Sequence, residues 1–304
     1  MTRPLPILAV QSAPIPGDIA ATWAKFEGES RALLKAYPQA RLVVWPELYL
    51  AALGAMAEAT PAAARPSQIA EPIPGPLTAR LGGLARELGV WLIPGSIYER
   101  GEGRRIHNTA LAFSPDGELV ARYRKLFPWR PYESTLPGDE LCVFDAPGIG
   151  RIGLMICYDG WFPEVARGLA WLGAELIVQP TATPTADREQ ELVLARANAI
   201  ANQVYLVNVN LGGRGPGRSV IVDPEGRILQ QAGNGEEELS EVIDLDTVAR
   251  VRRFGTAGLN RPWDQLDAEG GGVPLPMYAD GRIQPRPSPG SAPPSGRRLA
   301  GLDP

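Results

Sequence analysis

The chain changes from a strand pattern to a helix pattern within Gly150-Arg-Ile-Gly-Leu-Met-Ile-Cys157-Tyr-Asp-Gly-Trp-Phe-Pro-Glu164. The apolar half predicts a buried strand, and Pro163 suits the first turn of a helix. A cysteine in the tight turn between them would lie at the strand's C-terminal end, where the following helix favours a thiolate. By itself, Cys157 is equally compatible with a small buried core residue, which is the commoner role of a free cysteine.

Two other strand-like stretches also end in a charged side chain. The first is Arg41-Leu-Val-Val-Trp-Pro-Glu47, and the second is Glu118-Leu-Val-Ala-Arg-Tyr-Arg-Lys125-Leu-Phe-Pro. In open α/β sheets the C-terminal ends of strands are where ligands bind. A single Glu or Lys in such a place is usually a solvated surface charge. Three such placements in one chain favour a shared reactive site for Glu47, Lys125 and Cys157.

These three segments resemble the signature segments of the nitrilase superfamily of carbon–nitrogen hydrolases. The order Glu, Lys, Cys and the approximate spacings are also similar, and the resemblance covers roughly the first 255 residues. It implies an α/β fold built as a four-layer α-β-β-α sandwich. It also implies association across helical faces, as a homodimer or a larger homo-oligomer.

The resemblance also implies a mechanism for cleaving an amide. Cys157 would attack the carbonyl carbon as a thiolate, and Lys125 would favour that thiolate and stabilise the oxyanion with a backbone N–H near Tyr158. Glu47 would act as general base, then protonate the departing ammonia, and later activate water. Glu133 matches a second glutamate that positions substrate and catalytic groups in many amidases of the family; an exposed loop glutamate is the alternative.

The residues after the nucleophile favour an amide over other carbon–nitrogen substrates. True nitrilases usually have Trp-Glu after the cysteine, and N-carbamoyl-D-amino-acid hydrolases carry a pair of arginines; this chain has Tyr158-Asp-Gly-Trp161. The alternatives are a nitrilase or N-carbamoyl amidohydrolase with the same triad, or a non-catalytic binding protein that retains the fold. The predicted substrate-binding residues, which could equally be core or loop residues, are Trp129, Tyr132, Tyr158, Trp161, Thr181 and Thr183.

Composition excludes several other functions. With two cysteines and one histidine, His107, the chain lacks the usual zinc-ligand spacings, and a Ser-His-Asp mechanism would depend on a histidine with no nucleophile nearby in sequence. A net charge of −4 gives no electrostatic case for nucleic acid or an acidic membrane. We therefore expect an enzyme without metal or cofactor that acts on a small-molecule amide. Two cysteines and no signal-like N-terminus indicate the cytoplasm.

The extent of the resemblance implies a hydrolase domain over 1–255 and a C-terminal extension over 256–304, which is rich in Gly and Pro from about Glu269 onward. The extension is predicted either to be disordered or to pack on a neighbouring subunit. Helices are expected over 19–37, 77–88, 163–172 and 188–202. Strands are expected over 7–10, 42–45, 90–93, 108–113, 119–123, 152–156, 176–178, 204–208, 219–222 and 227–230.

Overall fold

The computed structural model describes residues 2–53, 66–103, 105–213 and 215–266, together with 278–279 and 282–283. The chain divides into two compact units, 1–261 and 262–304. In the second unit the described elements are α7 (Pro262–Leu266) and the paired strands β14 (Tyr278–Ala279) and β15 (Arg282–Ile283). The rest of the predicted extension lies outside the described residues, so its order and its packing stay predictions.

Two sheets form the centre of the first unit. One has the order β13-β1-β2-β3-β5-β4, with β6 on β5, and the other has the order β12-β11-β10-β9-β8-β7. Parallel pairing joins β1, β2 and β3 in the first sheet and β8, β9 and β10 in the second. The first sheet comprises β1 (Pro4–Gln11), β2 (Leu42–Val44), β3 (Trp91–Ile93), β4 (Ser96–Arg100), β5 (Ile106–Phe113), β6 (Leu119–Arg124) and β13 (Glu237–Asp244). The second comprises β7 (Cys142–Ala146), β8 (Gly150–Leu154), β9 (Leu176–Pro180), β10 (Tyr205–Val209), β11 (Val220–Val222) and β12 (Ile228–Gln231).

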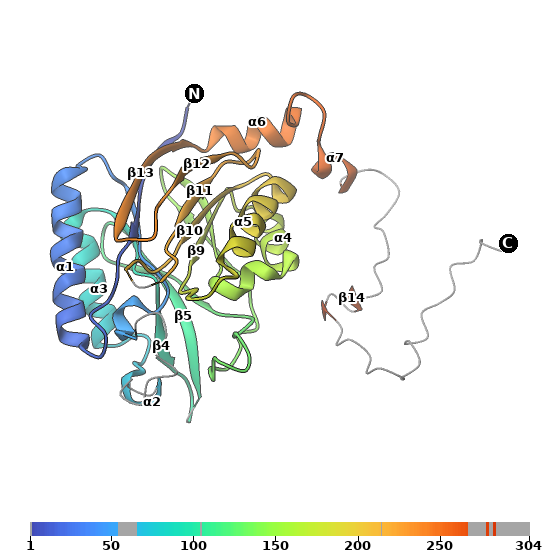
Figure 1. Cartoon of the computed structure of the whole chain (residues 1–304). Helices are drawn as coiled ribbons and strands as arrows, with labels where there is room; N and C mark the ends of the chain where they lie inside the picture. The colour runs from blue at the N-terminus through green and yellow to red at the C-terminus, as the bar shows by residue number, and fades with distance from the viewer. Residues whose placement is uncertain are drawn as a thin grey trace, which may run out of the picture. The chain divides into compact units, whose positions relative to one another are not determined.

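Helices cover the outer face of each sheet. Figure 1 shows α1 (Ile19–Ala36) and α3 (Pro76–Leu88) on one side of the sheets and α4 (Pro163–Trp171) and α5 (Arg188–Asn202) on the other. Two further helices are α2 (Pro66–Ile69) and α6 (Asp246–Phe254). The predicted four-layer α-β-β-α sandwich is confirmed. None of the helices in these described ranges is long and apolar enough to cross a membrane.

Strand β1 shows why the layers stack in this way. Ile7 and Ala9 join the cluster that fills the space between the two sheets, together with Leu154 and Val178 of the second sheet. Leu8 and Val10 join the cluster beneath α1 and α3. Because side chains alternate across a strand, a continuous apolar run is needed when both faces are covered.

Eight of the α-helices and strands described here were not predicted from the sequence, namely β4, β7, β13, β14, β15, α2, α6 and α7. Strand β13 reads Glu-Glu-Leu-Ser-Glu-Val-Ile-Asp, and pairing with β1 along its whole length organises it despite its charged residues. It lies at an end of the first sheet, where charged side chains still reach solvent. Tertiary pairing therefore overrides a weak local strand pattern here.

Gly95 allows the chain to pass closely behind the segment that carries Glu47. Its φ of +84° lies in the left-handed region, and a Cβ there would come 1.7 Å from the Pro46 carbonyl oxygen. We expect Gly95→Ala to lower the free energy of unfolding by more than about 1–2 kcal/mol, because it adds a clash to the cost of that backbone conformation. Urea denaturation measures this change.

Gly83→Ala is the matched control, since a Cβ at Gly83 in α3 meets nothing within 4 Å. We expect it to raise the free energy of unfolding by about 0.5–1 kcal/mol, the helix preference of Ala over Gly. If Gly95→Ala unfolded at the wild-type urea concentration, the close approach would not be a structural requirement.

Candidate active site

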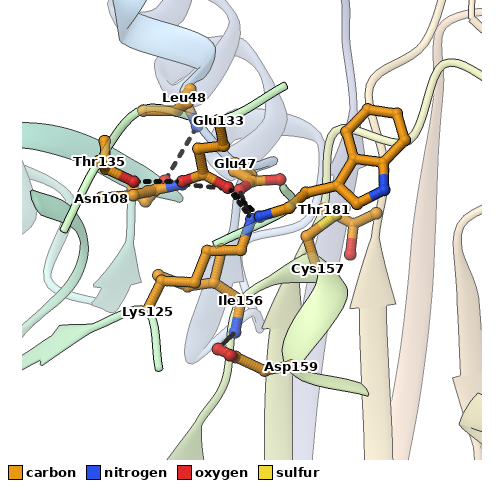
Figure 2. A network of polar contacts seen from close by, with 12 residues as sticks. Glu47, Leu48, Asn108, Lys125, Glu133, Thr135, Ile156, Cys157, Asp159 and Thr181 are labelled. Atoms are coloured by element: carbon orange, nitrogen blue, oxygen red, sulfur yellow. Dashed lines mark hydrogen bonds and ion pairs between the residues drawn. The ribbon is translucent and has the colours of Figure 1, made fainter. Parts of the chain in front are cut away.

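Lys125 lies at the centre of a buried group of charges. It follows β6, its side chain is 2% exposed, and its Nζ lies 2.9 Å from Glu47 Oε1 and 2.7 Å from Glu133 Oε2. Asn108 of β5 donates from Nδ2 to Glu47 Oε1 at 2.7 Å and to Glu133 Oε1 at 3.0 Å. Figure 2 shows both carboxylates turned toward the lysine. The structure therefore brings together three of the predicted residues and adds an amide that links the two carboxylates.

Backbone turns fix the two glutamates. Glu47 follows β2, and the next residue, Leu48, has a φ of +51° and donates its N–H to Ser96 Oγ at 3.1 Å. Glu133 accepts the Trp129 N–H at 3.0 Å and the Thr135 hydroxyl at 2.8 Å. Glu133 is 6% exposed, so it is not an exposed loop glutamate.

Cys157 opens the 3-10 turn η3 (Cys157–Trp161) just after β8. Its φ of +44° is unusual for a residue with a Cβ, and such strain is held by the surrounding structure. The Gln179 side chain donates to the Cys157 carbonyl at 2.8 Å, and Thr183 Oγ1 lies 3.6 Å from the sulfur. Figure 2 shows Cys157 beside the Lys125 group, which agrees with the electrostatic influence of Lys125 on the thiol.

Asp159 joins the cysteine turn to the lysine segment. It is fully buried and accepts the Ile156 N–H at 2.9 Å, the Phe127 N–H at 2.9 Å and the Tyr123 hydroxyl at 2.7 Å. Ile156 precedes Cys157, while Tyr123 and Phe127 flank Lys125. One carboxylate therefore sets the position of Cys157 relative to Lys125.

The surroundings of the two glutamates separate their acidities. Burial raises the pKa of Glu47, and Glu133 adds to this effect while Lys125 opposes it. Burial would also raise the pKa of Glu133, but Lys125, the Trp129 N–H and the Thr135 hydroxyl bring that pKa below its usual value. Burial disfavours the lysine charge, yet the two carboxylates raise the pKa of Lys125 well above its ordinary value. Lys125 is thus an ammonium, and Glu47 is the carboxylate that gains a proton more readily.

Lys125 lowers the pKa of the Cys157 thiol, which is the direction predicted from the sequence, but it does not outweigh burial. The effect of the following helix on the thiol stays a prediction. Burial raises the pKa of the thiol well above its usual value, and Glu47 adds to the rise while Lys125 opposes it. The raised pKa favours the protonated thiol in the free protein, so attack by the sulfur would need a base. The raised proton affinity of Glu47 suits that base.

The predicted substrate-binding residues occupy different environments. Tyr158 and Trp161 lie within η3 with ring centroids 6.0 Å apart, and Trp129 and Tyr132 lie 4.6 Å apart in the loop after Lys125. The Tyr132 side chain is 61% exposed. The Thr181 hydroxyl is buried and donates to Glu191 at 3.2 Å, whereas Thr183 Oγ1 lies 3.6 Å from Cys157 Sγ. Contact of these six residues with a substrate stays a prediction.

Sequence reasoning gave no role to four residues that the structure places around the three reactive groups. They are Asn108, Asp159, Gln179 and Glu191. Asp159 is part of the quoted segment around Cys157, so its position was a usable signal. Glu191 lies within a helix whose charged residues look solvated in the sequence. His107 is a structural residue whose Nδ1 donates to the Leu136 carbonyl at 3.0 Å.

No group of three or more His, Cys, Asp or Glu side chains suited to a metal occurs among the residues that the structure describes. The expectation of an enzyme without metal or cofactor stays a prediction.

We expect Asp159→Asn to lower the free energy of unfolding by about 1–3 kcal/mol. The amide nitrogen of asparagine would face a backbone N–H and could not accept a hydrogen bond from it. Burial raises the pKa of Asp159 from 3.8 to about 6, against the opposing influence of Lys125 and the hydrogen bonds. A raised carboxyl pKa stabilises the fold fully below about pH 4 and loses that effect as the pH rises through 6. The difference between wild type and variant should therefore be larger at pH 5 than at pH 7.5, as measured by urea denaturation.

The control is Asp145→Asn, which removes an exposed ion pair with Arg151. It should change the free energy of unfolding by less than about 1 kcal/mol. Equal effects of the two variants would show that the Asp159 bonds do not hold the turn.

Comparison with known proteins agrees with this arrangement. The sequence profile of the family described as "Carbon-nitrogen hydrolase" matches residues 7–253. The chain is 36% identical over 204 residues to the omega-amidase NIT2 of Homo sapiens, which covers 61% of this chain and 73% of that protein. It is 34% identical over 178 residues to a formamidase of Bacillus thuringiensis (strain Al Hakam), which covers 58% of this chain and 52% of the relative.

Solved structures give the same result. A carbon–nitrogen hydrolase from Helicobacter pylori superimposes with a TM-score of 0.73 at 27% identity, over 83% of this chain and 92% of that one. A mutant amidase from Nesterenkonia sp. superimposes with a TM-score of 0.66 at 26% identity, over 85% and 96% of the two chains. That structure shows covalent addition of the acetamide moiety of fluoroacetamide at the active site cysteine. This chain therefore belongs to the carbon–nitrogen hydrolase family, in the amidase-like branch of the nitrilase superfamily, and is a hydrolase of carbon–nitrogen bonds other than peptide bonds.

Proposed function

We propose that this protein is a thiol amidohydrolase that converts a small or medium carboxamide to a carboxylic acid and ammonia through a thioester on Cys157. The observation that carries the proposal is the buried Lys125 ammonium, held by Glu47 and Glu133 beside the only cysteine at the site. A fixed cation is suited to stabilise negative charge that develops on a carbonyl oxygen.

The first half of the reaction forms the acyl-enzyme. Glu47 takes the Cys157 proton as the sulfur bonds to the carbonyl carbon, and the oxygen of the tetrahedral intermediate accepts from Lys125 Nζ and a backbone N–H near Tyr158. An ammonium has three N–H groups, so Lys125 has one for the substrate after bonding two carboxylates. Glu47 then passes its proton to the amide nitrogen, the carbon–nitrogen bond breaks, and ammonia leaves.

The second half releases the acid. Glu47 takes a proton from water, the oxygen attacks the thioester carbon, and the sulfur leaves and regains a proton. A carboxylate with a raised pKa serves both steps, since it can hold a proton and also return it. Glu133, with its lowered pKa, stays ionised and positions Lys125 and Asn108.

Several observations favour amides as the substrate class. The relatives named above include an omega-amidase and a formamidase, and the neighbour whose active site cysteine carries the acetamide moiety of fluoroacetamide is an amidase. The aromatic residues at η3 and in the loop after Lys125 supply an apolar wall for the acyl part. A homodimer or larger homo-oligomer in the cytoplasm remains our proposal for its assembly and location.

We expect purified protein to release ammonia from at least one amide in a panel of aliphatic amides, aromatic amides, N-carbamoyl amino acids and nitriles. Cys157→Ala should lower kcat by at least about a thousandfold, because no other group can form the thioester. Mass spectrometry of the wild type with a slowly hydrolysed amide should show the acyl group on Cys157.

Cys142→Ala is the matched control, since Cys142 is the other cysteine of the chain and packs against the core in β7. It should retain ammonia release. Hydrolysis of nitriles or N-carbamoyl amino acids alone would move the protein to another branch. A silent panel with an unreactive Cys157 would favour a non-catalytic binding protein.

Glu47→Gln should lower kcat by about 10²–10⁴-fold, as expected for loss of a general base. Glu133→Gln should lower kcat by a smaller factor. It should also move the acid limb of the pH profile of kcat/KM to lower pH. The reason is that the Glu133 carboxylate raises the pKa of Glu47, so removing its charge lowers that pKa. Activity that requires ionised Glu47 then persists to lower pH.

The control for this pair is Glu140→Gln, because Glu140 is an exposed residue of the same loop. Its profile should match that of the wild type. An unchanged turnover and an unchanged acid limb in Glu133→Gln would remove Glu133 from the mechanism.

A further inference from the structure

A second buried polar network contacts Cys157 and is not used by the mechanism above. Arg188 and Glu191 lie in the first turn of α5, with Nη1 and Oε2 2.8 Å apart and both side chains 2% exposed. Arg188 also donates to the backbone carbonyls of Gly217 and Arg218 at 3.0 and 2.8 Å. Both side chains of this pair are almost fully buried, and Thr183 lies between Glu191 and Cys157.

Thr183 is the link between this ion pair and the sulfur. Its Oγ1 lies 2.6 Å from Glu191 Oε2 and 3.6 Å from Cys157 Sγ. Its backbone N–H donates to Asn210 Oδ1 at 2.9 Å, which fixes the residue. The hydroxyl is therefore held between a carboxylate and a sulfur.

Hydrogen-bond chemistry determines how this contact is polarised. A carboxylate in an ion pair only accepts, and a threonine hydroxyl has one hydrogen to donate. The Thr183 hydrogen is therefore taken by Glu191 in the short bond, and only lone pairs of Oγ1 face the sulfur. The Thr183 oxygen can therefore accept a hydrogen bond from the Cys157 thiol, but it has no hydrogen to donate to a thiolate.

We propose that Glu191, acting through Thr183, keeps the proton on Cys157 while the substrate site is empty. The inference rests on the proposed role of Cys157 as nucleophile and makes Thr183 and Glu191 positioning residues. Because the thiolate is the reactive form of cysteine, a protonated resting sulfur is protected from alkylation and oxidation. Deprotonation is then confined to the complex, where Glu47 accepts the proton as the sulfur attacks.

The charges around Cys157 support this direction. Glu47 after β2 and Glu191 in α5 both raise the pKa of the thiol in addition to burial, and Lys125 after β6 lowers it. Asp159 lies in the same turn, but its oxygens are bonded to Ile156, Phe127 and Tyr123. The network on the α5 side therefore acts against Lys125.

The test measures the rate at which iodoacetamide alkylates the free protein as a function of pH. A Cys142→Ser background leaves Cys157 as the single thiol of the chain. Glu191→Gln removes the charge, and Thr183→Val removes the acceptor at constant shape. We expect each to lower the apparent pKa of Cys157 by about one unit, and so to raise alkylation at pH 7 by about tenfold.

Two controls separate the link from general packing effects. Thr183→Ser keeps the hydroxyl and should keep the wild-type pH profile. Thr181→Val removes a hydroxyl that also bonds Glu191, at 3.2 Å, and should shift the profile less than Thr183→Val. If Glu191 acts through Thr183, the double variant Glu191→Gln/Thr183→Val should shift the apparent pKa of Cys157 by much less than the sum of the two single-variant shifts.

Three outcomes would each overturn the proposal. Thr183→Val could keep the wild-type alkylation profile, the pKa shifts of Thr183→Val and Glu191→Gln could be fully additive, or Thr181→Val could shift the pKa of Cys157 as much as Thr183→Val does. If Glu191→Gln does not fold, because Arg188 loses its partner, the comparison of Thr183→Val with Thr183→Ser still decides. The measurement needs no substrate, so its failure leaves the amidase proposal standing, and failure of amide hydrolysis leaves the alkylation result interpretable.

Discussion

The arrangement of this site depends on burying one ammonium, that of Lys125. Moving an isolated ammonium out of water costs several kcal/mol, and the cost is offset only when charged partners meet it in good geometry. Glu47 after β2 and Glu133 in the following loop supply those partners at 2.9 and 2.7 Å. The cation thus ties together segments that follow β2 and β6 of the first sheet. Removing either carboxylate would leave excess buried charge, so the site and the local fold are stabilised by the same contacts.

The second sheet must deliver the sulfur to this cation, and Asp159 provides the connection. Its bonds to Ile156 on one side and to Tyr123 and Phe127 on the other cross from the β8 turn to the β6 segment. Packing between the sheets brings the two segments near one another, and these directional bonds fix the geometry. A positive φ at Cys157 is tolerated because the turn is held from both sides.

Sequence alone predicted the features that rest on local patterns and on ordered motifs. Continuous apolar runs predicted the parallel strands β2, β8 and β9 because those strands are buried on both faces. The α-β-β-α layers and the reactive segments followed from the motif order around Glu47, Lys125 and Cys157. Strand β13 could not be predicted because pairing with β1 organises it, and Glu191 could not because its burial depends on packing around α5. The net rise of the Cys157 pKa could not be predicted for a related reason: charge proximity is visible in a motif, but desolvation is not.

The two carboxylates Glu47 and Glu191 make the nucleophile dependent on its substrate. Each contributes to holding a proton on Cys157, and Lys125 and a backbone hydrogen bond from Ala182 oppose them. A carbonyl oxygen that accepts the third Lys125 N–H develops negative charge as the sulfur attacks, and Lys125 stabilises that charge. This stabilisation is absent in the free protein. The proton can then pass to Glu47, whose own pKa burial has raised, whereas the Thr183 oxygen, already bonded to Glu191, offers no base of comparable strength. A partly buried thiol with a high proton affinity is therefore compatible with efficient attack, because the transition state, and not the resting site, supplies the stabilisation that ionises it.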